Sequence, residues 1–204
     1  MGTVRVSDLI NRAKTSAQDI DYVQWTADEW LDWLNECLLT ITALRPDSSS
    51  ETRTVQLVNG SRQSVPDDSH KLLDIICNTE SGRAIRIITR DVLDQQTPNW
   101  HKSKGKEPLF YTVDANTPKT FYVYPAAKDG HQIDVVLSVA PSKITSADTT
   151  IPFDDWYAPA IVDYLLYRAY LKNAEFTNDL VRSTHFIQAF YSRLGGKLTS
   201  QGGE

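Results

Sequence analysis

The sequence contains few of the residues on which metal binding, disulfide formation or nucleotide binding depends. Among its 204 residues are 2 cysteines, 9 glycines and 4 histidines. The histidines stand far apart in the chain, without the short spacing of a metal site. The glycines do not form the closely spaced loops that wrap phosphates. We therefore expect no cofactor and no metal ion, and we interpret Cys37 and Cys77 as free thiols in apolar surroundings.

Charge and hydropathy argue against two further classes of protein. The net charge is −5, whereas proteins that grip nucleic acid usually carry a basic excess. No apolar run reaches the length of about 20 residues that a membrane-spanning helix needs. The first residues lack the apolar core of a signal peptide. We expect a globular protein that is made in the cytosol, has no membrane partner and recognises no DNA sequence.

Residues 151–172 form the most apolar stretch of the chain. From Pro159 onward the apolar residues recur at helical spacing. Three tyrosines extend the apolar surface round most of the remaining circumference of the helix: Tyr164, Tyr167 and Tyr170. Such a helix packs against more than one neighbour, within its own domain or in another subunit. Asp163 and Arg168 interrupt the run without facing each other, so each needs a partner on another helix or chain if it is buried.

The predicted helices come from both ends of the chain. Periodicity predicts helices over residues 4–18, 26–44, 153–173 and 177–194. The second of them has a clear start signal, because Thr26 and Glu29 have the spacing of a capping box. Trp25 and Trp30 flank this start at the spacing of a hydrophobic staple. We therefore expect the entry angle of the second helix to be fixed.

Between the helices the periodicity changes to the two-residue repeat of β-strands. Asn59-Gly60 predicts a hairpin between residues 54–58 and an arm that ends at Val65. Further strands are predicted at residues 72–77, 84–88, 109–113, 120–124 and 132–139, the first two as an antiparallel pair, with a short helix at 90–97. The predicted fold class is α+β: a four-helix bundle of residues 1–46 and 152–194, an inserted antiparallel β-sheet domain of residues 47–151, and a flexible tail of residues 195–204.

Two clusters of charge each admit a structural and a functional interpretation. The second helix carries an acidic face made of Asp28, Asp32 and Glu36. This face is either simply solvated, or it repels DNA or docks a basic partner. A polar loop contains Trp100, His101, Lys102, Lys104 and Lys106. This loop is either a solubilising surface loop or a protein-docking loop, and it lacks the interleaved exposed aromatic residues of a nucleic-acid site.

Asp154 and Asp155 are the one pair of adjacent carboxylates that raises the question of catalysis. Adjacent carboxylates at a helix start usually cap the helix and complement its dipole, and a catalytic pair is the alternative. No serine stands in a nucleophile-elbow motif, and neither cysteine has a basic neighbour that would lower its pKa. We expect that the protein is not an enzyme.

Four segments together resemble a known family. They are Trp25–Asn35, Ala43–Asp47, Phe121–Pro125 and above all Ala160–Tyr170. As an ordered set they resemble the head-to-tail adaptor (connector) proteins of short-tailed phages, which are similar in role to tail tubular protein A. The resemblance covers residues 4–194.

This resemblance implies a structural virion protein at the head–tail junction. It would form a ring of twelve copies under the portal protein, continue the DNA channel and carry the tail tube or nozzle. A tail fibre is a further potential partner, and double-stranded DNA would pass through without sequence recognition. We hypothesise that subunit or portal contacts involve Tyr164, Tyr167, Tyr170, Asp163 and Arg168, and that Gly196, Lys197 and Leu198 of the tail contact the portal or a neighbouring subunit.

Three alternatives remain open from the sequence. The first is another tail-completion or nozzle component, which would lie further from the portal. The second is a small enzyme that uses Asp154, Asp155 or His101. The third is a DNA-binding regulator, which the net charge of −5 opposes.

Overall fold

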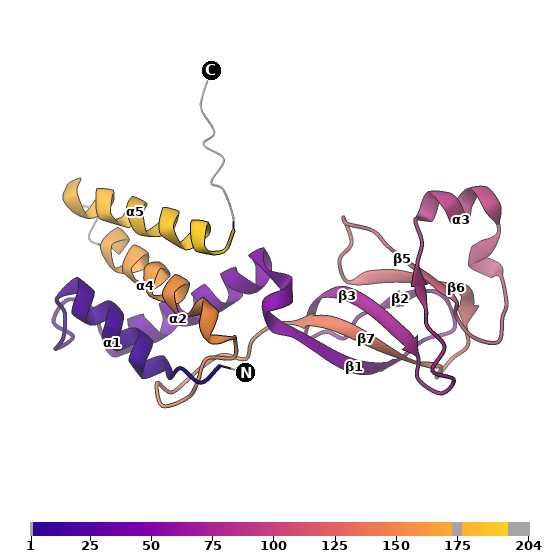
Figure 1. The fold of residues 1–204 in the computed structure, drawn as a ribbon, viewed down its shortest axis with the longest axis horizontal. Helices are drawn as coiled ribbons and strands as arrows, with labels where there is room; N and C mark the ends of the chain where they lie inside the picture. Colours follow the sequence, from indigo (N-terminus) through magenta and orange to yellow (C-terminus); the bar gives the residue numbers. More distant parts are fainter. Residues whose placement is uncertain (1, 173–176, 196–204) are drawn as a thin grey trace, which may run out of the picture. The chain divides into compact units, whose positions relative to one another are not determined.

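The computed structural model describes residues 2–172 and 177–195 of the chain. In this part the protein is α+β, with five α-helices and two β-sheets (Figure 1). The chain divides into two compact units. Residues 1–48 and 141–204 form the first, which we call the helical unit, and residues 49–140 form the second, which we call the β unit. The β unit is therefore inserted between helices that come from both ends of the chain.

The helical unit is organised around its fourth helix. Its helices are α1 (Val6–Ala17), α2 (Ala27–Leu44), α4 (Ala158–Lys172) and α5 (Thr177–Arg193). Helix α4 contacts α1, α2 and α5, and Figure 1 shows it between α1 and α5. The prediction that this helix packs on more than one neighbour is thus confirmed, and the neighbours lie in the same protomer.

Helix α4 begins later than the sequence predicts. We expected a start near residue 153, but Asp155–Tyr157 form a 3-10 turn and the α-helix begins at Ala158. The residues before it are extended, because Ile151 N–H donates to the Val4 carbonyl at 3.0 Å and Thr150 pairs with Arg5. Pro159 then lies in the first helical turn, where its missing N–H costs no hydrogen bond.

The start of α2 matches its sequence signals. The Thr26 side chain accepts a hydrogen bond from the Glu29 N–H, and the Glu29 carboxylate accepts one from the Thr26 N–H, so the predicted capping box is confirmed. Trp25 and Trp30 meet edge to face with ring centroids 5.6 Å apart, and Trp33 adds a second such contact to Trp30 at 5.3 Å. These fully or nearly buried indoles anchor the core of the helical unit.

The β unit consists of two sheets instead of the single antiparallel sheet that we predicted. Its elements are β1 (Ser50–Gln56), β2 (Gly60–Ser64), β3 (Ser69–Asn78), β4 (Arg86–Ile87), α3 (Arg90–Gln96), β5 (Phe110–Val113), β6 (Thr120–Ala127) and β7 (Gln132–Val139). One sheet has the order β1-β7-β3 and the other β2-β6-β5-β4. Within the second, β4 runs parallel to β5. The strands predicted at residues 109–113, 120–124 and 132–139 and the short helix at 90–97 are confirmed.

The predicted hairpin at Asn59-Gly60 is wrong. Strand β1 pairs with β7, and β2 pairs with β6, so the two arms belong to different sheets. The buried Gln63 side chain fixes the connection between β1 and β2. Its Oε1 accepts a hydrogen bond from the Val58 N–H at 2.8 Å, and its Nε2 donates to the carbonyls of Val58 and Gly60. A side-chain amide thus satisfies the backbone groups that a hairpin ladder would have paired.

The second predicted hairpin is also largely absent. Residues 72–77 form part of β3, but the returning arm makes only an isolated bridge, between Cys77 and Ala84. The arm then leaves β3, and its two-residue strand β4 joins β5 in the other sheet. The segment therefore crosses from one sheet to the other where the sequence suggested a continuous pair.

The two ends of the β unit lie next to each other. In the register of β1 and β7, Ser50 stands opposite Ser138. An insert whose ends meet in this way can interrupt another domain without distorting it. Residues 141–151, which we predicted to belong to the inserted domain, fall in the helical unit. There Val6 N–H donates to the Thr149 carbonyl, and Asn35 exchanges hydrogen bonds with the backbone of Ile144.

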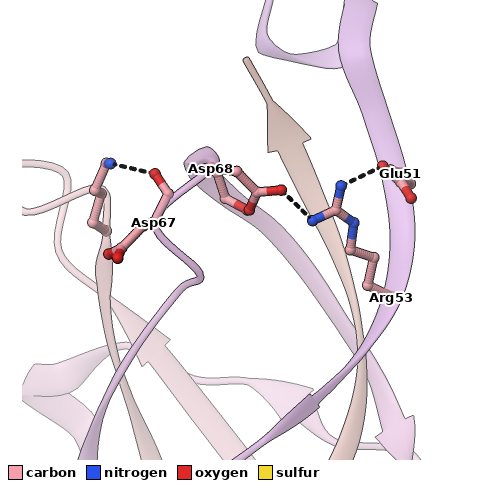
Figure 2. Close-up of polar contacts among 6 residues, drawn as sticks. Glu51, Arg53, Asp67 and Asp68 are labelled. Carbon is pink, nitrogen blue, oxygen red and sulfur yellow. Dashed lines mark hydrogen bonds and ion pairs between the residues drawn. The ribbon is translucent and has the colours of Figure 1, made fainter. Parts of the chain in front are cut away.

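A polar cluster fastens the connection between β2 and β3 to its surroundings (Figure 2). The Arg53 guanidinium lies between two carboxylates and donates to Glu51 at 2.8 Å and to Asp68 at 2.6 Å. The Lys119 ammonium donates to the Asp67 carbonyl at 3.3 Å. Arg53 lowers the pKa of both carboxyl groups, chiefly by these hydrogen bonds. The cluster links β1 to the connection that enters β3 and to the residue before β6.

Candidate functional site

Two of the three predicted interface tyrosines of α4 belong to the interior of the protomer. Tyr164 and Tyr170 are buried, whereas Tyr167 is half-buried. The Tyr164 ring packs against Phe190 of α5 with centroids 5.1 Å apart, and Tyr170 stacks on Phe186 at 5.8 Å. Burial raises the pKa of the Tyr164 hydroxyl. Of the three, Tyr167 therefore offers the most surface to another subunit.

Asp163 and Arg168 find their partners on neighbouring helices of the same chain. The buried Asp163 carboxylate accepts a hydrogen bond from Arg193 Nε of α5 at 2.6 Å. Arg168 pairs with Glu36 of α2. The two ion pairs thus tie α4 to the helices on either side of it, as charges placed on an otherwise apolar helix require.

The acidic face of α2 is largely matched by cations of the helical unit. Besides the pair between Glu36 and Arg168, Glu29 pairs with Lys172, and Asp32 lies 3.4 Å from the Lys143 ammonium. The hydrogen bond from Lys172 lowers the pKa of Glu29. Asp28 is exposed. Hence the face carries less uncompensated negative charge than its sequence suggests, and both roles that we assigned to it remain proposals.

The loop between α1 and α2 presents two apolar side chains from a fixed backbone. The buried Asp19 carboxylate accepts hydrogen bonds from the N–H groups of residues 23, 24 and 25 at 2.7, 2.9 and 3.2 Å. Tyr22 has a φ of 56°, which is rare for a bulky residue, and its ring is covered by the Lys14 ammonium at 3.1 Å. Ile20 and Val23 are nevertheless 64% and 84% exposed. The loop thus keeps two apolar side chains in solvent on a backbone that hydrogen bonds hold in place.

Trp156 is the most exposed large apolar residue of the described chain. It lies in the 3-10 turn before α4 and is 90% exposed. Its exposure was not predicted, because residues 151–172 have the composition of one helix that is apolar round most of its circumference. The signal that could have revealed it is the composition Asp154-Asp155-Trp156, in which a tryptophan follows two carboxylates at a chain turn.

Asp155 has a structural role at the start of the chain. Its carboxylate accepts hydrogen bonds from Thr3 N–H at 2.8 Å, Thr3 Oγ1 at 2.6 Å and Val4 N–H at 3.1 Å. These bonds lower the pKa of Asp155. An ionised carboxylate that holds a backbone segment in this way favours the structural interpretation over a general acid or base.

The loop predicted at residues 100–108 is ordered around a buried tryptophan. Trp100 is fully buried, and its indole Nε1 donates to Asp94 at 2.7 Å. His101 stacks on it with ring centroids 3.7 Å apart. His101, Lys102 and Lys104 line a pocket of about 530 Å³ together with Lys128, whereas Lys106 is not among the lining residues. Three of the five predicted loop residues, His101, Lys102 and Lys104, thus line one pocket, whereas Trp100 is buried in the interior.

Several further predictions can be placed. Within residues 2–172 and 177–195, no cluster of three or more histidine, cysteine or acidic side chains could hold a metal ion. The described helices include none with the length and apolar character needed to cross a bilayer. Cys37 is a buried free thiol, and burial raises its pKa. Gly196, Lys197 and Leu198 lie outside the described residues.

Both compact units expose large apolar side chains, among them Trp156 in the helical unit and Ile87 in the β unit. Comparison with known families shows the class of protein. The SU10 adaptor protein family matches residues 4–204, so the chain belongs to this family of phage head-to-tail adaptors. The family is structural and not enzymatic, which removes the hypothesis of a small enzyme. A search of curated proteins found no match.

Proposed function

We propose that the chain is one subunit of a closed ring, of twelve copies as the resemblance implies, at the head–tail junction of a tailed phage. The ring lies under the portal protein, continues the DNA channel, and carries the tail tube or nozzle. Membership of the SU10 adaptor protein family over residues 4–204 supports binding to portal and tail components. DNA passes through the ring without sequence recognition.

The observation that carries this proposal is the exposed apolar surface of the helical unit. Trp156, Val23 and Ile20 are exposed although the unit already buries a core of its own. Tryptophan is the residue type most enriched among the few that dominate the energy of an interface. In a ring, each subunit uses one surface to contact a different surface of the next, and the rotation closes the assembly. We assign Trp156 and the loop residues Ile20 and Val23 to such subunit contacts.

This assignment revises the role of the α4 tyrosines. Tyr164 and Tyr170 pack on α5 inside the protomer. A charged residue at either position would unfold the protomer, and loss of assembly would then say nothing about the interface. Tyr167 remains a proposed interface residue because part of its surface is open.

The test compares assembly of wild type and Trp156→Ala on purified portal, by electron microscopy and by mass. We expect the variant to fold normally and to occupy portals poorly. A wild-type protein located further down the tail, away from the portal, would instead identify a tail-completion component. A Trp156→Ala variant that fills portals as the wild type does would remove Trp156 from the interface.

The tail supplies a separate test of portal attachment. We propose that residues 196–204, among them Gly196, Lys197 and Leu198, become ordered against the portal or a neighbouring subunit. Deletion of these residues should weaken attachment and leave the free energy of unfolding of the protomer unchanged. Attachment at wild-type strength after the deletion would contradict this role.

A further inference from the structure

The β unit contains a basic pocket with fixed walls. It has a volume of about 530 Å³, and it is lined by three lysines, Lys102, Lys104 and Lys128, and by the imidazole of His101. We call it the basic pocket. Lys104 and Gly105 form one wall. Their segment is joined to β6, since Ala126 N–H donates to the Ser103 carbonyl at 3.0 Å and Lys104 bridges to Ala126. The wall comes so close to β6 that a Cβ atom at Gly105 would lie 2.7 Å from Pro125 Cβ.

The imidazole of His101 is held from two sides. One face stacks on the buried Trp100 ring, which is itself anchored to Asp94. Nδ1 lies 2.9 Å from Ser61 Oγ of β2. A polar ring that is oriented by its neighbours and still exposed is prepared for a ligand, because little side-chain freedom is lost on binding.

The charge of the basic pocket is uncompensated. No carboxylate lines it. Within the described ranges, Lys102, Lys104 and Lys128 have no ion-pair partner, whereas cations elsewhere, such as Arg53, Arg83 and Arg168, each have one. Three ammonium groups around one concavity repel one another, and an anionic ligand would relieve that repulsion.

We propose that the basic pocket binds an acidic segment of a partner protein, through carboxylate side chains. Each ammonium group can pair with one carboxylate as a point charge, and an acidic segment offers several carboxylates to the three lysines of the pocket. The lining also includes the methyl groups of Ala126 and Ala127, which can contact the aliphatic part of a glutamate side chain. A duplex would need a basic track along its backbone, and a single concavity does not provide one. The pocket binds its ligand whether or not a ring forms.

The experiment measures binding of a fluorescent hexaglutamate peptide to the full-length protein by anisotropy, at about 50 mM salt, where surface charges are weakly screened. The pocket variant is Lys102→Gln with Lys104→Gln. The control is Lys71→Gln with Lys106→Gln, two exposed lysines outside the pocket that give the same change in net charge. Circular dichroism of both variants serves to check that they are folded.

We expect saturable binding of the peptide with one site per protomer. The pocket variant should weaken it by about tenfold or more, and the control much less, because only the former removes groups that contact the ligand. Equal weakening in both variants would show diffuse attraction and overturn the proposal. Absence of peptide binding would overturn it too, and so would pocket-dependent binding of duplex DNA in preference to the peptide.

Discussion

Different interactions stabilise the interior of the helical unit and the interior of the β unit. Among the described residues, the buried cluster of the helical unit contains 7 aromatic side chains, and that of the β unit contains 2 among mostly aliphatic residues. In the β unit, buried polar side chains such as Gln63 and Asn78 instead fix the loops and strand ends. Large rings hold the packing of helices, and hydrogen-bonded amides hold irregular backbone between two sheets.

The two units also differ in charge. Residues 49–140 contain 11 basic and 11 acidic residues, which leaves 10 basic and 15 acidic residues in the remainder. The whole net charge of −5 therefore belongs to the helical unit, and the neutral β unit contains the basic pocket. We propose that the β unit makes electrostatic contacts through the basic pocket, whereas the helical unit makes apolar contacts through Trp156, Ile20 and Val23.

The largest expected effect tests the aromatic core of the helical unit. Trp30→Ala should lower the free energy of unfolding by about 3–5 kcal/mol, because it removes a fully buried indole between Trp25 and Trp33. Denaturant unfolding followed by circular dichroism measures it. Trp30→Phe should cost less, since the buried indole N–H has no hydrogen-bond partner in the described structure. Equal costs would mean that ring volume does not determine the stability of this core.

The next largest effect tests the buried side-chain hydrogen bonds that stabilise the β unit. Asn78 Nδ2 donates to the carbonyls of Arg83 and Pro108, so its Oδ1 accepts from His131 Nε2 at 2.7 Å. Asn78→Ala should lower the free energy of unfolding by about 1–3 kcal/mol, because it leaves these groups without their partner.

Asn116→Ala provides the control for this prediction, since Asn116 is exposed and its backbone N–H bond to Asp114 is retained. The same denaturant measurement applies to both variants. If Asn78→Ala were as mild as the control, the buried amide would not be what fixes this loop.

A smaller effect depends on pH and concerns the N-terminal residues of the helical unit. The pKa of Asp155 is lower in the folded protein, so its ionised form stabilises the fold above the unfolded value of about 4. This stabilisation is lost as the pH falls through the folded pKa. The stability difference between wild type and Asp155→Asn should therefore be constant near neutral pH and shrink in acid.

Thermal unfolding from neutral to acidic pH measures this difference. Thr3→Val removes the shortest of the three hydrogen bonds and should reduce the same pH-dependent difference. A difference that stayed constant down to the lowest pH would show that the Asp155 charge does not stabilise the N-terminal residues.

The smallest effect on stability is expected at Trp156, the residue whose substitution we expect to impair assembly strongly. Trp156→Ala should change the free energy of unfolding by no more than about 0.5 kcal/mol, because the side chain is 90% exposed. Denaturant unfolding of the isolated protein measures it. A large loss of stability would place Trp156 in the core of the protomer and end its assignment to a subunit contact.

The sequence predicts the helical unit better than the β unit, for identifiable reasons. The helices, the capping box at Thr26 and the staple of Trp25 and Trp30 depend on residues close in the chain, so periodicity and spacing reveal them. The hairpin at Asn59-Gly60 was wrong because β1 and β2 each gain a longer-range partner and the Gln63 amide replaces the local ladder. Local turn preference is weak compared with such tertiary pairing.

The surfaces were harder to predict than the helices. The basic loop was recognised from its lysines, but the burial of Trp100 and the contribution of Lys128 to the basic pocket depend on contacts with β6 and with the turn that follows it. Trp156 was hidden in an apolar stretch, because composition does not tell which side chain stays outside. Exposure is a property of the fold, and only three-dimensional structure reveals it.

The mass of the assembled protein tests the central claim most directly. Native mass spectrometry of the purified chain, alone and mixed with the portal protein, counts the copies that associate. Our account predicts a closed ring, of twelve copies as the resemblance implies, on each portal, and it predicts that Trp156→Ala reduces this occupancy without unfolding the protomer. A chain that stays a single copy in both samples, or binds the portal without forming a ring, would contradict it.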